Sequence, residues 1–160
     1  MAVSSVDIAL FLHVTSVVVG FGATFAEALA VPVAMRLSAR HLPYVHRLQL
    51  AINQWLATPA LALVLITGLF MVDRLKLSMG DAWLGATFAI LVVLGGLLGA
   101  YFIPTDRKLG ELVEAEIAAA GDGEVRLSEE YLRRSRVEGL VGTLTGLLIV
   151  VAIFLMVVKP

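Results

Sequence analysis

Long apolar runs, each with very few charged residues, divide the chain into four segments. The runs cover residues 8–35, 50–72, 82–103 and 139–158. Each is close to or above the roughly 20 residues that an α-helix needs to cross about 30 Å of hydrocarbon. Strands of a membrane barrel would alternate polar and apolar residues, and no such alternation occurs. The pattern predicts a single all-α membrane domain, residues 1–160, built as a bundle of four transmembrane helices.

Residues 104–138 form the longest polar segment, between the third and fourth runs. Its apolar residues recur at helical spacing among charged ones, which predicts a short amphipathic helix. They are Leu109, Leu112, Val113 and Ile117. Gly121-Asp122-Gly123 would end this helix, and Ser128 with two following glutamates is typical of the start of another. We expect a short cytoplasmic helical hairpin that lies at the membrane surface.

Composition agrees with a membrane protein and excludes several function classes. Hydrophobic residues make up 59% of the chain and charged residues 16%, more apolar surface than a soluble domain of this length could bury. The net charge of −1 offers no basic excess for nucleic acid. Cysteine is absent, which excludes disulfides and thiol chemistry. The expected partners are the lipid bilayer and either further copies of the chain or a larger membrane complex.

The distribution of basic residues predicts the orientation in the membrane. Nine of the twelve Lys and Arg residues lie in the connections that follow the first and third runs. The positive-inside rule places these connections in the cytoplasm and both termini outside. The first basic residue is Arg36, so the N-terminal run lacks the basic head of a secretory signal and is interpreted as a retained span. We expect a multi-pass protein of a bacterial inner (cytoplasmic) membrane.

Polar residues of the first run share one face of the predicted helix. His13, Ser16, Gly20, Thr24 and Glu27 follow one another at steps of three and four residues. His13 and Glu27 are separated by about 21 Å along a helix axis, too far for contact. Ionisable side chains inside a membrane usually face the bundle interior and carry a function. The two residues therefore mark two separate candidate sites.

Glu27 has a functional and a structural interpretation. In the first it carries protons or cations through an oligomeric transporter. In the second it forms an interfacial ion pair with Arg36, Arg40 or Arg136, or is a protonated acid bonded to a neighbouring helix. Asn53 and Glu138 are expected at a similar depth. The predicted polar intramembrane cluster comprises Ser16, Thr24, Glu27, Asn53 and Glu138.

His13 also has two interpretations. It is either a neutral imidazole bonded to another helix or an axial ligand of haem b, since helical bundles hold cofactors between facing helices. Met71 and Met156 are expected near the depth of His13 and are the candidate second ligands, although methionine more often serves packing. His41 and His46 lie five residues apart, off the spacing that shares a helix face. We predict no metal site from that pair.

Several short motifs stand out, namely Leu12-His13-Val14 with Gly20-Phe21-Gly22, then residues 66–69, and the closing residues 154–160. They resemble a bacterial family of predicted integral membrane proteins, domain of unknown function 2269. The resemblance covers nearly the whole chain. The histidine and glycines of the first run also resemble, more loosely, the four-helix copper-resistance D proteins and the haem-dependent protoporphyrinogen oxidases. That likeness implies haem ligation by His13, whereas the other polar residues of the oxidases have no clear equivalents here.

Three functions fit these observations. A membrane subunit that holds haem b or another hydrophobic ligand within the bundle ranks first, because the first run concentrates its polar groups on one face. The alternatives are an accessory subunit of a larger membrane complex and an oligomeric proton or cation transporter that uses Glu27. Motifs for phosphate binding and for metal- or serine-dependent hydrolysis are missing, so no catalytic residue is predicted.

Overall fold

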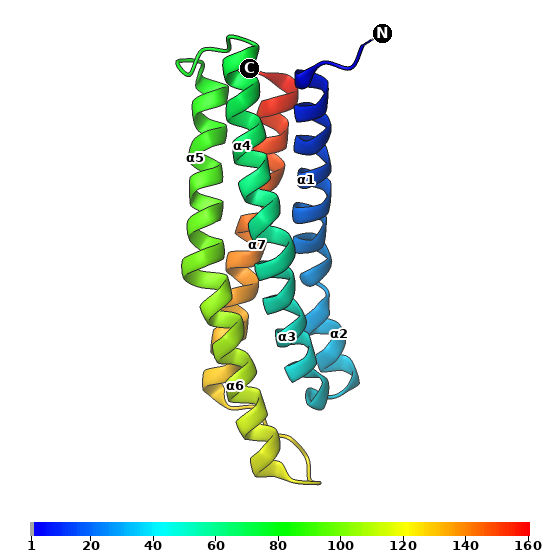
Figure 1. The fold of residues 1–160 in the computed structure, drawn as a ribbon. Helices are drawn as coiled ribbons and strands as arrows, with labels where there is room; N and C mark the ends of the chain where they lie inside the picture. Colours follow the sequence, from blue (N-terminus) through cyan, green and yellow to red (C-terminus); the bar gives the residue numbers. More distant parts are fainter. Residues whose placement is uncertain (1) are drawn as a thin grey trace.

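The computed structural model describes residues 2–160, and all regular secondary structure in that range is helical. Four helical rods lie side by side, and all four are long and apolar enough to cross a membrane (Figure 1). The rods are α1 (Ser5–Glu27) with α2 (Ala30–Leu37), α3 (Leu42–Ile52) with α4 (Thr58–Arg74), α5 (Ala82–Leu97) with α6 (Ile103–Ala120), and α7 (Glu129–Val158). The predicted all-α membrane architecture with four spans is confirmed.

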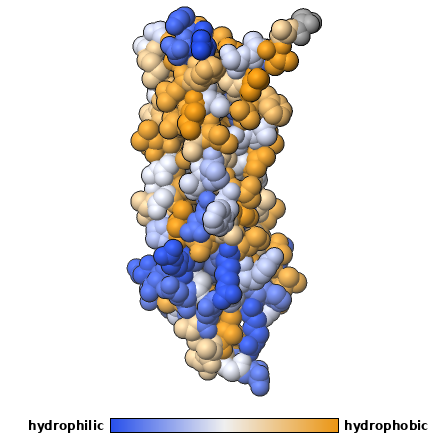
Figure 2. Space-filling view, in the orientation of Figure 1, coloured by the Kyte–Doolittle hydropathy of each residue, from blue (hydrophilic) through white to orange (hydrophobic). Residues whose placement is uncertain are grey.

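The two ends of the bundle differ in character. Both chain termini lie at one end, beside the connection from α4 to α5, and we call it the terminal end (Figure 1). The connections from α2 to α3 and from α6 to α7 lie at the opposite end, which we call the basic-loop end. Figure 2 shows hydrophobic side chains along most of the length and hydrophilic ones gathered at the ends, chiefly the basic-loop end. A bilayer would cover the apolar part.

Outward-facing apolar side chains agree with this placement. Trp55 is 80% exposed and Val92 71% exposed within the isolated chain. Large apolar groups so fully exposed would be unfavourable in water, whereas lipid tails solvate them at no cost.

The most extensive contact between helices is the one between α1 and α4. A Cβ atom added at Gly20 would lie only 2.5 Å from Cβ of Ala60. Glycine at this position therefore lets the two backbones come together, as small residues do in many membrane helix pairs.

Two π-helical turns interrupt the rods, each just before a proline. Residues Asn53–Ala57 precede Pro59, and residues Leu98–Phe102 precede Pro104. Proline has no N–H and its ring clashes with the carbonyl four residues earlier, so a wider turn relieves the strain. The Thr58 hydroxyl donates to the carbonyl of Asn53 at 2.7 Å and satisfies one acceptor there.

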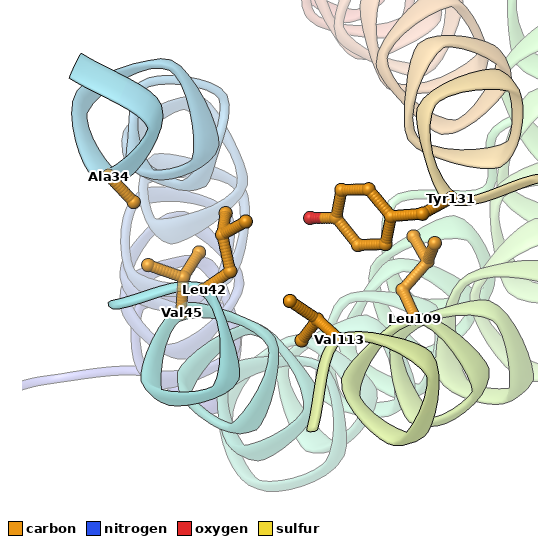
Figure 3. Packing of buried hydrophobic residues seen from close by; sticks show 6 residues of the cluster. All are labelled: Ala34, Leu42, Val45, Leu109, Val113 and Tyr131. Carbon is orange, nitrogen blue, oxygen red and sulfur yellow. The ribbon is translucent and has the colours of Figure 1, made fainter. Parts of the chain in front are cut away.

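The predicted hairpin is present, but it extends the bundle lengthwise. Because α6 continues the direction of α5, its apolar face packs against α3 and α7 (Figure 1). A buried apolar cluster results, shown in Figure 3 and composed of Ala34, Leu42, Val45, Leu109, Val113 and Tyr131. We call it the end core. Ser128 caps α7 by accepting from the backbone of Tyr131 at 3.1 Å, as the sequence predicts.

Candidate functional site

A layer of buried polar side chains lies next to the end core, on its terminal-end side. Along α3, α6 and α7, these polar residues follow the apolar residues of the end core in the direction of the terminal end. A second apolar cluster, which includes Val64, Leu91, Leu94 and Ile149, lies beyond them. We call the layer the polar cluster. Its members are Glu27, His46, Asn53, Asp106 and Glu138.

Four of the five members of the polar cluster are almost completely buried. The exposed fractions are 1% for His46, 2% for Asp106, 6% for Asn53 and 7% for Glu138, and Glu27 is half-buried. Ionisable groups at such depth are costly unless they are paired, protonated or bound to a cation. The cluster therefore demands a neutralising partner.

Two hydrogen bonds hold side chains of the polar cluster in place. The amide of Asn53 donates to Oδ2 of Asp106 at 2.8 Å, from the π-helical turn of the second rod to α6. Nε2 of His46 lies 2.9 Å from the Tyr131 hydroxyl, and the two rings meet edge to face. Both contacts join different rods, so they set the orientation of Asp106 and His46 through tertiary structure.

Three potential metal ligands converge within the polar cluster. One imidazole nitrogen of His46 and one carboxylate oxygen each of Asp106 and Glu138 lie within 4.8 Å of one another. They come from α3, α6 and α7. Neutral imidazole and carboxylate are common ligands of divalent transition metals.

Negative charge in the polar cluster has no basic partner among residues 2–160. The ion pairs of that range are Arg47–Glu114, Lys76–Asp73 and Arg134–Glu130, all outside the cluster. Glu27 therefore forms no ion pair with Arg36, Arg40 or Arg136, so the ion-pair part of its structural interpretation is wrong. Oε1 of Glu27 and Oε1 of Glu138 are buried without a hydrogen-bond partner. Asp106 lies within electrostatic range of both of these glutamates.

The polar stripe of α1 faces the bundle interior, but only its last residue reaches the polar cluster. His13, Ser16 and Gly20 are buried, whereas Thr24 and Glu27 are half-buried. The Thr24 hydroxyl bonds within its own helix, to the carbonyl of Gly20 at 3.3 Å. Of the five predicted cluster residues, the structure thus places Glu27, Asn53 and Glu138 in one layer, apart from Ser16 and Thr24.

Sequence reasoning missed His46, Asp106 and Tyr131. The pattern around His46 gives no signal, because its nearest histidine, His41, is exposed and bonds to the carbonyl of Ser38. A signal for Asp106 does exist: it precedes Leu109 by three residues and so shares the apolar face of the amphipathic helix. A charged residue on such a face is a candidate for a buried functional group.

His13 occupies a separate position nearer the terminal end. Its ring is 4% exposed, Nδ1 lies 2.9 Å from the Thr67 hydroxyl, and Nε2 is buried without a partner. The ring also fits against Gly68, where an added Cβ would be 3.5 Å from Cε1. Met71 and Met156 are half-buried, and their role as haem ligands stays a prediction.

Comparison with known proteins supports the membrane assignment and adds no activity. A family model described as "Predicted integral membrane protein (DUF2269)" matches residues 7–160. No curated protein and no solved structure matches the chain. The match covers all four candidate spans almost completely.

Proposed function

We propose that this chain, which belongs to the DUF2269 family of predicted integral membrane proteins, binds a proton or metal cation inside the membrane and transports it. The observation behind this proposal is the meeting of Asp106 and Glu138 within 4.8 Å in a buried layer, near the half-buried Glu27, with none of the three in an ion pair with Lys or Arg. Uncompensated carboxylates in such a place require protons or a cation. Cation transport needs at least one site inside the membrane that binds the cation, and the carboxylates of the polar cluster provide such a site.

Glu27 is the carboxylate best placed to pass the cation on. It is the last residue of α1, immediately before the break that separates α1 from α2. Carbonyl groups at a helix C-terminus carry partial negative charge, which disfavours a bare carboxylate and favours a bound proton or cation. The side chain also keeps one buried oxygen free of hydrogen bonds.

A transport pathway through this protein would run between copies of the chain. Apolar clusters flank the polar cluster on both sides, so a cation would leave the buried carboxylates sideways through Glu27, the only partly exposed member of the polar cluster. We therefore expect a homo-oligomer in an inner membrane, with the basic-loop end in the cytoplasm.

Vesicle flux tests this function. Purified protein is reconstituted into liposomes that enclose a pH-sensitive dye, and a pH gradient is imposed. Flux above empty liposomes that falls at least tenfold in Glu27→Gln, and is retained in the exposed control Glu111→Gln, is the expected result. Flux no greater than that of empty liposomes, for protons and for Zn²⁺ or Mn²⁺ with a metal-sensitive dye, would overturn it.

A cofactor subunit with His13 as a haem ligand is the second candidate, and one observation favours it. The Thr67 hydroxyl donates its single proton to the carbonyl of Leu63, so it must accept from Nδ1 of His13. Nε2 then carries a free lone pair in a buried position, which is the form that binds iron. Haem b would supply redox chemistry there.

An absorption spectrum decides this second candidate. The protein is expressed with adequate haem, purified in mild detergent, and measured oxidised and reduced beside His13→Ala and the exposed-histidine control His41→Ala. A Soret band lost only in His13→Ala supports ligation, and Met71→Ala and Met156→Ala identify the second ligand. A colourless protein rules haem out.

A further inference from the structure

Three side chains of the polar cluster have the chemistry and spacing of a metal site. We propose that His46, Asp106 and Glu138 bind one divalent transition-metal ion between α3, α6 and α7. Their ligand atoms lie within 4.8 Å of one another, and each side chain is at least nine-tenths buried. Small side-chain rotations suffice to bring atoms so spaced to the roughly 2.0–2.2 Å of nitrogen and oxygen ligands around one ion.

Unpartnered atoms point independently to a missing ligand. Oε1 of Glu138 and Nδ1 of His46 are both buried without a hydrogen-bond partner. Buried polar atoms are nearly always satisfied in proteins, because each unsatisfied one costs about 1–3 kcal/mol. A metal ion in this layer satisfies both atoms at once.

Neighbouring residues hold two of the ligands as metal sites require. Tyr131 contacts Nε2 of His46, so the unpartnered Nδ1 is the nitrogen left for the ion. Asn53 donates to Oδ2 of Asp106 at 2.8 Å and fixes the carboxylate plane. Such partners orient the ligands of a metal, and losing one typically weakens binding about 10- to 100-fold.

Charge balance also favours a divalent ion. Two carboxylates and a neutral imidazole carry a charge of −2, which one divalent ion cancels, and neither carboxylate forms an ion pair with Lys or Arg. The mixed nitrogen and oxygen ligands suit Zn²⁺, Mn²⁺ or Fe²⁺ better than Ca²⁺ or Mg²⁺, which prefer oxygen alone. Gln49 lies one turn from His46 on α3. Its side-chain oxygen is buried without a hydrogen-bond partner and is available as a further metal ligand.

This inference rests on the proposed function and names its cation. The test uses full-length protein in detergent, stripped with a chelator and titrated with Zn²⁺ in a calorimeter, with the visible spectrum of Co²⁺ as a second readout of ligand geometry. Asp106→Asn and Glu138→Gln preserve side-chain shape and remove one charged ligand each. His41→Ala and Asp122→Asn change exposed residues of the same end and serve as controls.

We expect one Zn²⁺ per chain, affinity at least tenfold weaker in both ligand variants, and unchanged binding in the controls. The metal site would be overturned if folded, monodisperse wild-type protein bound none of Zn²⁺, Mn²⁺ and Co²⁺. It would also be overturned if the double variant Asp106→Asn/Glu138→Gln bound Zn²⁺ as tightly as wild type. Proton flux through Glu27 without metal binding refutes the metal site and leaves transport standing. Metal binding without any flux refutes transport and leaves the metal site standing.

Discussion

The hydroxyl of Tyr131 lies 2.9 Å from Nε2 of His46, and this contact joins the end core to the polar cluster. Both side chains are 1% exposed. Neither partner has water to replace the other, so the pair links the packing of α7 to the orientation of a candidate metal ligand on α3.

Removing the Tyr131 hydroxyl is therefore expected to affect stability and binding together. Tyr131→Phe leaves Nε2 of His46 without a partner, which lowers the free energy of unfolding by about 1–3 kcal/mol and weakens Zn²⁺ binding roughly tenfold. Denaturant unfolding in detergent and calorimetry measure the two effects. Tyr44→Phe, at a side chain 70% exposed, is the matched control. Equal behaviour of both variants would contradict the role of this bond.

The close approach of α1 and α4 predicts a steric defect and its rescue. Gly20→Ala places a methyl group 2.5 Å from Cβ of Ala60, so the helices must separate, at a cost of about 1–3 kcal/mol. Adding Ala60→Gly makes room and restores most of the loss. Gly22→Ala meets no atom within 4 Å and controls for helix propensity. Thermal unfolding in detergent follows all variants, and a Gly20→Ala protein as stable as wild type would refute the tight crossing.

The hydrogen bond between Thr67 and His13 predicts a tautomer. Because the Thr67 hydroxyl donates to the Leu63 carbonyl, wild-type His13 carries its proton on Nδ1, which nitrogen NMR of labelled protein detects. Thr67→Val keeps the side-chain shape but removes the acceptor, so the tautomer becomes mixed. Stability falls by about 1–3 kcal/mol. The control Thr143→Val changes an exposed threonine, and a proton on Nε2 in wild type would contradict the assignment.

Repulsion within the polar cluster predicts that one acid destabilises the metal-free protein. Glu138→Gln removes an acid that must lose its charge to be buried next to Asp106 when no metal is bound, and it is expected to raise the free energy of unfolding by about 1–2 kcal/mol in chelator. The gain disappears once Zn²⁺ is added, because only wild-type protein gains from the ion. Glu130→Gln, which breaks an exposed pair with Arg134, changes stability by less than about 1 kcal/mol. A loss of stability in metal-free Glu138→Gln would contradict the prediction.

Local pattern predicted the elements well, because each depends on nearby residues. The four spans follow from apolar length, the start of α7 from Ser128, and the buried face of α1 from the spacing of His13, Ser16 and Gly20. The direction of α6 was not predicted, since it depends on the packing of Leu109 and Val113 against α3.

By itself the sequence determined that this is a four-span helical membrane protein with polar groups on the inner face of α1, since hydrophobicity and periodicity act within one segment. Only the tertiary structure decided which polar groups meet. Asp106 and Glu138 are far in the chain from His46 and Asn53 and from each other. Their contact depends on how three rods align and on the π-helical turn that begins at Asn53. Helix register and packing set that alignment, and no local pattern of residues encodes it.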